Sequence, residues 1–120
     1  MALAYSHIVM RHSRQPVNQG RLVKASRKFQ GENISCGDQV TLFVKLDSKK
    51  KITDVGWEGE GCAISQASTS IFSEMIKGKT LAQAQKITGE TLMKKMDTQL
   101  SPARVKCATL PVHTLKEATD

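Results

Sequence analysis

The sequence predicts an α+β fold that combines a three-stranded antiparallel sheet with about four to five helices. Two patterns support this prediction. Residues 39–47 alternate between apolar and polar side chains, which is typical of a strand with one buried face. After Gly59-Glu60-Gly61 the apolar residues recur every three or four positions, which indicates an amphipathic helix; they are Ile64, Ala67, Ile71 and Met75.

The N-terminal quarter is expected to hold a short helix followed by an edge strand. Residues 3–12 have helical spacing; their inward positions would be Leu3, His7 and Ile8, with Met10 as a further candidate. The turn-forming residues at 15–20, which include Pro16 and Gly20, end this helix. Residues 21–28 are predicted to form the edge strand.

A β-hairpin is predicted next. Its first strand, over residues 39–47, would bury one face made of Val40, Leu42, Val44 and Leu46. Asp47-Ser48-Lys49-Lys50 has the composition of a hairpin turn. The returning strand would line one face with Thr53, Val55 and Trp57.

The second half of the chain is expected to be helical. A first helix would begin at Cys62 and end at Gly78, and its second face is rich in Ser and Thr, which are poor helix formers that need tertiary packing. Thr80 is placed to cap a second helix, and Gly89 to Met96 would form a third. A last helix is predicted from about Cys107 to Ala118. It would tolerate Pro111 only in its first turn.

The charge of the chain, +7, is concentrated near the N-terminus. Before Glu32 there are six basic residues and no acidic one, whereas the remainder holds twelve basic against eleven acidic residues. Such a surface suits nucleic acid or an acidic protein partner, and the alternative is an ordinary solvated face. Nucleic acid is disfavoured because stacking requires aromatic side chains, and Tyr5 and Phe29 are the only ones nearby.

The same composition indicates a single cytoplasmic domain over residues 1–120. There is no run of 18 apolar residues and no basic flank before a long apolar start, so neither a membrane span nor a secretory signal is expected. An Arg-rich start also fits a transit peptide, but Pro16 and Gly20 interrupt the amphipathic helix that such a peptide needs. Free thiols suit a reducing cytosol.

Three cysteines are the candidates for chemistry. Cys36 lies in the tripeptide Cys36-Gly37-Asp38, and the other two are Cys62 and Cys107. Three thiolates and a carboxylate make a tetrahedral ligand set for zinc, iron or a nascent iron–sulfur cluster. The alternative is that they are separate buried cysteines, because they spread over 72 positions without zinc-finger spacing.

Position in the predicted elements favours a shared site. Cys62 and Cys107 would each lie at a helix N-terminus, where free N–H groups stabilise thiolate over thiol. Gly37 would let Asp38 approach the same centre, at one edge of the sheet. Further candidate ligands or bases are, in each case, better explained as ordinary surface or helix residues: His7, His12, His113, Glu58 and Glu60.

Three local strings resemble the U-type iron–sulfur cluster assembly family, which includes SufU, IscU and the N-terminal domain of NifU. They are Asn33-Ile34-Ser35-Cys36-Gly37-Asp38, then Gly59-Glu60-Gly61-Cys62-Ala63-Ile64-Ser65-Gln66-Ala67-Ser68, then Arg104-Val105-Lys106-Cys107-Ala108-Thr109-Leu110. The start agrees as well, at Tyr5, His12, Pro16, Asn18 and Gly20. The resemblance therefore covers nearly the whole chain.

The resemblance implies a three-stranded sheet against helices and a site made of Cys36, Asp38, Cys62 and Cys107. It also implies a partner, a pyridoxal-phosphate cysteine desulfurase of the SufS or IscS type, which donates persulfide sulfur. Members of the family either relay this sulfur while holding zinc, as SufU does, or assemble a labile [2Fe–2S] cluster on the same residues, as IscU does. Downstream Suf or carrier proteins would receive the product.

Local sequence features allow this chain to be compared with both branches of the family. The strings around Cys62 and Cys107 look like SufU, because the scaffold branch has His where this chain has Lys106. The scaffold branch also carries a Leu-Pro-Pro-Val-Lys chaperone peptide, and the corresponding stretch here, residues 100–106, reads Leu-Ser-Pro-Ala-Arg-Val-Lys. Unlike typical SufU, however, the chain has only 44 residues between Cys62 and Cys107 and lacks the usual insertion.

We therefore expect a SufU-like sulfur acceptor with zinc on the four site residues. Cys36 would be the accepting thiol and Arg104 would support a displaced thiolate or carboxylate. The chain would at most be a zinc-dependent sulfurtransferase, with no turnover of a small molecule by itself. The alternatives are a [2Fe–2S] scaffold and a small basic domain with structural zinc that binds nucleic acid.

Overall fold

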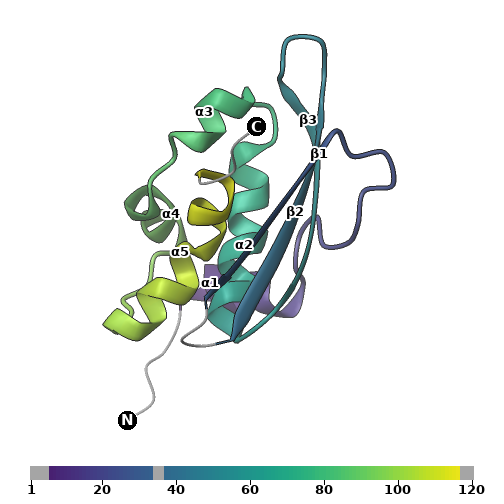
Figure 1. Cartoon of the computed structure of the whole chain (residues 1–120). Helices are drawn as coiled ribbons and strands as arrows, with labels where there is room; N and C mark the ends of the chain where they lie inside the picture. The colour runs from purple at the N-terminus through teal and green to yellow at the C-terminus, as the bar shows by residue number, and fades with distance from the viewer. Residues whose placement is uncertain (1–5, 34–36, 117–120) are drawn as a thin grey trace.

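The computed structural model describes residues 6–33 and 37–116 of the 120-residue chain. Its elements confirm the predicted α+β fold (Figure 1). In chain order they are α1 (His7–Arg14), β1 (Arg27–Asn33), β2 (Asp38–Leu46), β3 (Ile52–Glu60), α2 (Ala63–Ile76), α3 (Leu81–Gln85), α4 (Gly89–Met96) and α5 (Pro102–Lys116).

The three strands form one antiparallel sheet in the order β1-β2-β3. The central strand β2 buries the face predicted from its alternation, and its Leu42 lies between Phe29 of β1 and Trp57 of β3. The predicted turn joins β2 to β3, where the Asp47 carboxylate accepts hydrogen bonds from the backbone N–H groups of Lys49 and Lys51 at 2.8 and 2.9 Å. The hairpin prediction is therefore confirmed.

Helices α2 and α5 cover one face of the sheet (Figure 1), α2 against β3 and α5 against β1 and β2. Helix α2 is also packed against α1, α4 and α5, so nearly all of its faces are buried. Its hydroxyl groups are accommodated because they bond to carbonyls of their own helix: Thr69 donates to Ser65 O at 2.7 Å, and Ser73 to Ser70 O at 2.6 Å. As predicted, tertiary packing surrounds this segment of poor helix formers.

The edge strand predicted at residues 21–28 was wrong, because β1 begins only at Arg27. Residues 18–20 instead hydrogen-bond to the free edge of β3, with Gly20 N donating to Trp57 O at 2.7 Å. The chain then crosses the outer face of the sheet, where Arg21 lies over the Phe43 ring, and pairing with β2 starts at Ser26. A segment that runs across the strands cannot at the same time form the ladder of backbone hydrogen bonds along one strand.

The first helix also differs from its prediction over residues 3–12. It begins at His7, after Ser6, whose hydroxyl accepts a hydrogen bond from Val9 N at 3.2 Å as an N-cap. The buried residues are Val9 and His12, while His7 is exposed and Leu3 lies outside the described residues. Ile8 packs against the core as predicted, whereas His7 and Met10 are exposed, so the inward face was predicted only in part.

The last helix begins five residues before the predicted start at Cys107. Pro102 is its first residue, a position that proline favours because no N–H is needed there, and Ser101 Oγ accepts from Arg104 N at 3.4 Å. Pro111 consequently lies inside the helix and not in its first turn, which corrects the prediction. The remaining helix starts, at Leu81 after Thr80 and at Gly89, were predicted correctly.

Among the described residues, no helix is both long enough and apolar enough to span a membrane.

His12 anchors the N-terminal segment to α2. Its Nδ1 lies 2.6 Å from the Ser70 hydroxyl, whose oxygen accepts a hydrogen bond from Val17 N at 2.7 Å, and its Nε2 lies 3.4 Å from a Glu74 carboxylate oxygen. This arrangement fits a neutral imidazole with its proton on Nε2. Burial lowers the pKa of His12 from its ordinary value, the attraction of Glu74 opposes this change, and repulsion from Arg11 adds to it.

We predict that His12 makes the fold less stable in mild acid. Because its pKa is lower in the folded than in the unfolded chain, its contribution is constant above about pH 6.5 and declines as the pH falls from there towards the folded pKa. Unfolding free energies from urea denaturation, measured between about pH 7.5 and 5, should show a smaller pH slope for His12→Asn than for the parent chain. Parallel slopes would contradict this assignment.

Candidate metal centre

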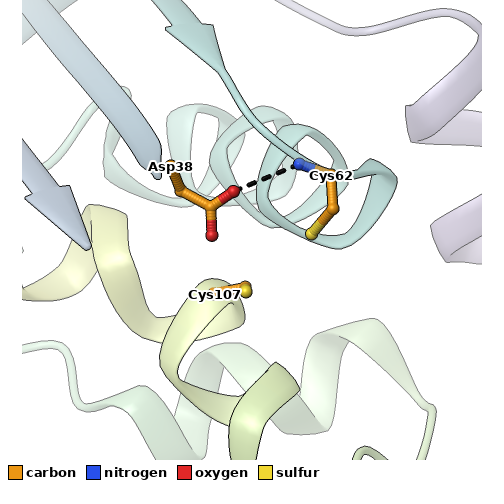
Figure 2. A group of neighbouring side chains, drawn as sticks. All are labelled: Asp38, Cys62 and Cys107. Atoms are coloured by element: carbon orange, nitrogen blue, oxygen red, sulfur yellow. Dashed lines mark hydrogen bonds between the residues drawn. The ribbon is translucent and has the colours of Figure 1, made fainter. Parts of the chain in front are cut away.

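Asp38, Cys62 and Cys107 come together at one end of the sheet. One ligand atom from each, a carboxylate oxygen and two Sγ atoms, lies within 4.8 Å of the other two. Figure 2 shows the three side chains pointing toward a common centre from β2, from the start of α2 and from α5. The structure thus brings together three of the four predicted ligands, including residues 69 positions apart in the chain.

The end of β3 places Cys62. After Glu60 the backbone turns at Gly61, which has φ +154°, and Cys62 becomes the N-cap residue of α2 with an extended backbone. The Gln66 side chain donates from Nε2 to Gly59 O at 3.0 Å, which ties the first turn of α2 back to β3. The prediction that Cys62 starts a helix is confirmed.

The Asp38 carboxylate is buried, with 1% of its surface exposed, and its two oxygens have different surroundings. Oδ1 accepts from Cys62 N at 3.2 Å and lies 3.4 Å from the Ser65 hydroxyl. Oδ2 is buried and has no hydrogen-bond partner among the described residues. Since buried polar atoms are nearly always satisfied, Oδ2 fits the place of a metal ligand.

Gly61 and Ser65 support this carboxylate, a role that was not predicted from the sequence. A Cβ atom on Gly61 would lie 2.2 Å from Asp38 Oδ1, so only glycine leaves room for the carboxylate. Ser65 is the third residue of α2 and is 5% exposed, and its one hydroxyl hydrogen is shared between Asp38 Oδ1 and Cys62 O, the latter at 3.0 Å. The sequence offered one indication of this role, because Ser65 lies one helical turn after the predicted helix start at Cys62.

Cys107 lies in the second turn of α5, so the predicted helix N-terminus applies to Cys62 alone. It is fully buried, and its Sγ lies 3.8 Å from Ala103 O one turn earlier. Pro111, four residues later, has no N–H to donate to the Cys107 carbonyl. The thiol therefore points into the site from the interior of a helix and not from its end.

The fourth predicted ligand, Cys36, lies outside the described residues. The chain leaves the described part at Asn33 and re-enters it at Gly37, whose N–H donates to Asn33 O at 2.8 Å. Gly37 has φ +75° and is exposed, which agrees with the predicted need for glycine before Asp38.

The other candidates lie elsewhere. The metal-ligand group found in the described part of the chain contains no histidine: His7 and His113 are exposed, and His12 bonds to Ser70. Glu58 and Glu60 are exposed on β3. Arg104 is exposed in the first turn of α5, one turn before Cys107, and its support of the site stays a prediction.

The donor set can hold a metal ion that accepts both sulfur and oxygen. Thiolates are soft ligands that suit zinc or iron, and a carboxylate oxygen beside them is a harder, more easily exchanged ligand. The two cysteines form no disulfide. Fold and site together define a small α+β protein in which two thiols and one aspartate form a group that could hold a metal ion.

Comparison with known proteins identifies the family. The NifU-like N-terminal domain family matches residues 4–120, and the chain belongs to this family, which includes IscU and SufU proteins. The chain is 37% identical to the iron–sulfur cluster assembly scaffold protein IscU of Thermotoga maritima, over 97% of this chain and 92% of that protein. It is 35% identical to the zinc-dependent sulfurtransferase SufU of Bacillus subtilis, over 88% and 82% of the two chains.

A solved structure has the same fold. FiSufU from the thermophile Fervidobacterium islandicum AW-1, described as a scaffold protein for the SUF system, superimposes with a TM-score of 0.82 at 38% identity, over 95% of both chains. The alignment with the Thermotoga protein spans 134 positions, more than the 120 residues of this chain. That relative therefore has residues without a counterpart here.

We predict that Gly61→Ala weakens zinc binding at least tenfold, because the new methyl group displaces the Asp38 carboxylate from its N–H partner. Ser65→Ala should weaken it by a smaller factor, since Cys62 N still donates to Oδ1. Competition with a chromophoric zinc chelator measures both affinities.

Gly78→Ala is the matched control for Gly61→Ala. Gly78 also has a positive φ, +92°, but its Cβ would meet no atom within 4 Å. The two variants therefore share backbone strain and differ in the clash with Asp38. Equal zinc affinities for the two would show that the carboxylate support is not needed.

Proposed function

We propose that this chain accepts persulfide sulfur from a cysteine desulfurase at a zinc-bound site of Cys36, Asp38, Cys62 and Cys107, as a step in iron–sulfur cluster assembly. The observation that carries the proposal is the meeting of Asp38, Cys62 and Cys107 within 4.8 Å. It is supported by the relationship to a zinc-dependent sulfurtransferase of Bacillus subtilis.

The residues of the site suit zinc. Two Sγ atoms and the buried Asp38 Oδ2 supply three ligands, and Cys36, two residues before Asp38, would supply the fourth. Bound zinc would keep the cysteines as thiolates at neutral pH. Oδ1 would keep the hydrogen bond that it accepts from Cys62 N, and this bond would hold the carboxylate in a fixed orientation.

Cys36 is the proposed acceptor. Chain connectivity keeps its Cα within about 7 Å of the Asp38 Cα, and it is followed by Gly37, which is exposed. Its thiolate would attack the outer sulfur of the desulfurase persulfide. A new S–S bond then forms on Cys36, the old S–S bond breaks, and the desulfurase cysteine leaves as a thiolate. Cys107, which is fully buried, is poorly placed for this attack.

Arg104 is proposed to assist this step. It lies on the exposed side of α5 one turn before Cys107, and its guanidinium would stabilise a thiolate or carboxylate released from the metal. The neighbouring stretch, residues 100–106, lacks the chaperone peptide of the scaffold branch, and from Pro102 it forms the start of α5. Handover to a chaperone is therefore not part of the proposal.

Scaffolding of a [2Fe–2S] cluster is the second candidate function. The observation that favours it is the similarity to the Thermotoga scaffold protein IscU, at nearly the same identity as to SufU. The same side chains would hold the cluster, which would be cargo for a downstream carrier protein. The two functions differ in what the chain passes on: sulfur or a finished cluster.

The first test is desulfurase turnover under anaerobic conditions. We predict that a SufS-type desulfurase is stimulated saturably by the zinc-loaded chain and not by the zinc-stripped chain. Cys36→Ala should abolish transfer of ³⁵S from cysteine to the chain while leaving the circular dichroism spectrum unchanged. Undiminished transfer to Cys36→Ala would refute the acceptor assignment.

The second test separates sulfur acceptor from scaffold. Asp38→Ala would remove the easily exchanged ligand and would trap a cluster if the chain were a scaffold. We predict that Asp38→Ala, given ferrous iron, cysteine and desulfurase, develops no stable visible chromophore. A coloured, stable variant would establish the scaffold function instead.

A further inference from the structure

Five lysines converge at the end of the molecule opposite the metal centre. Lys49, Lys50 and Lys51 form the β2–β3 turn, and Lys77 and Lys79 lie in the connection between α2 and α3. All five are exposed. We call this set the lysine end. The sequence pattern indicated a basic excess near the N-terminus instead, and the proposed function does not involve these five residues.

Backbone hydrogen bonds hold the two segments of the lysine end together. Ile52 N donates to Lys79 O at 2.7 Å, Gly78 N to Ile52 O at 2.8 Å, and Leu81 N to Lys50 O at 2.9 Å. Figure 1 shows the hairpin and α3 at the same end of the molecule. The charges are thus presented by a fixed backbone and not by a free tail.

Carboxylates near the lysines neutralise only part of their charge. The Asp47 carboxylate turns back onto the backbone N–H groups of Lys49 and Lys51, and Asp54 lies 3.9 Å from Lys77 Nζ. The turn N–H groups lower the pKa of Asp47, so this carboxylate remains ionised. Five ammonium groups against two carboxylates leave an excess of three positive charges.

The lysine end is well separated from the metal centre. Strand β2 runs from Asp38 in the site to Leu46 beside the turn, a distance of roughly 27 Å along a strand. The site end of the sheet carries the exposed carboxylates of Glu32 and Glu60, and a third, Glu58, forms an ion pair with Arg21 at 3.5 Å. The sheet is therefore acidic at the metal centre and basic at the far end.

We propose that the lysine end is a docking surface for an acidic protein, which binds while the metal centre stays open to its own partner. The positive charge of the lysine side chains favours a partner surface that presents carboxylates. The set contains no arginine, whose planar fork favours phosphate, and no aromatic ring on which a base could stack.

The probe for this proposal is a fluorescein-labelled oligo-glutamate peptide, followed by fluorescence anisotropy and by amide shifts in ¹H–¹⁵N NMR spectra of the zinc-loaded chain. We expect binding that weakens with salt, and shift changes confined to residues 47–52 and 77–81. The double variant Lys49→Glu with Lys79→Glu should lose about tenfold in affinity. Its zinc content should equal that of the parent chain.

Lys94→Glu with Lys95→Glu is the matched control, since it changes the net charge equally on α4. The proposal predicts a loss of less than about twofold for this control. Equal losses for the two double variants, shift changes elsewhere, or no binding of the peptide would overturn it. Tighter binding of a fluorescein-labelled DNA duplex, or of phosphatidylserine vesicles, than of the peptide would also overturn it, because phosphate would then be the preferred ligand.

Discussion

The two oxygens of Asp38 have different roles, and the metal centre depends on this difference. Oδ1 is held by the N–H of Cys62, the N-cap residue of α2, and by Ser65, and this fixes the start of β2 against the start of α2. Oδ2 is thereby left facing the two thiols. Gly61 exists as glycine because any Cβ there would occupy the space of Oδ1. Without a metal the buried Oδ2 has no partner among the described residues, so metal binding and folding should be coupled.

The fold was predictable where one local pattern determined the structure. The alternation of β2, the Asp47 turn and the capping residue Thr80 act through neighbours in sequence, and all were predicted correctly. The predictions were wrong for residues 21–26 and for the start of α5. The first depends on long-range contacts, since Leu22 packs over Gly56 across the sheet. For the second, Pro111 was taken as a first-turn residue, although tertiary packing holds it inside a helix.

The candidate site was likewise predictable only where a local sequence pattern determined it. Residue type and motif predicted Asp38, Cys62 and Cys107, and the structure brings their ligand atoms together. The reason offered for Cys107, a helix N-terminus, was wrong, because Pro102 starts α5 a turn and a half earlier. Ser65 and Gly61 were missed because their role exists only once β2 and α2 meet. The lysine end was missed for the same reason: its two segments lie 26 residues apart in sequence.

The central claim is that zinc is bound by three sulfurs and one Asp38 oxygen. X-ray absorption at the zinc edge, measured on the zinc-loaded chain and on Asp38→Ala, tests it directly. The account predicts three sulfur scatterers near 2.3 Å and one oxygen near 2.0 Å, with a changed light-atom shell in Asp38→Ala. A shell of nitrogen and oxygen alone, or identical spectra for the two proteins, would contradict it.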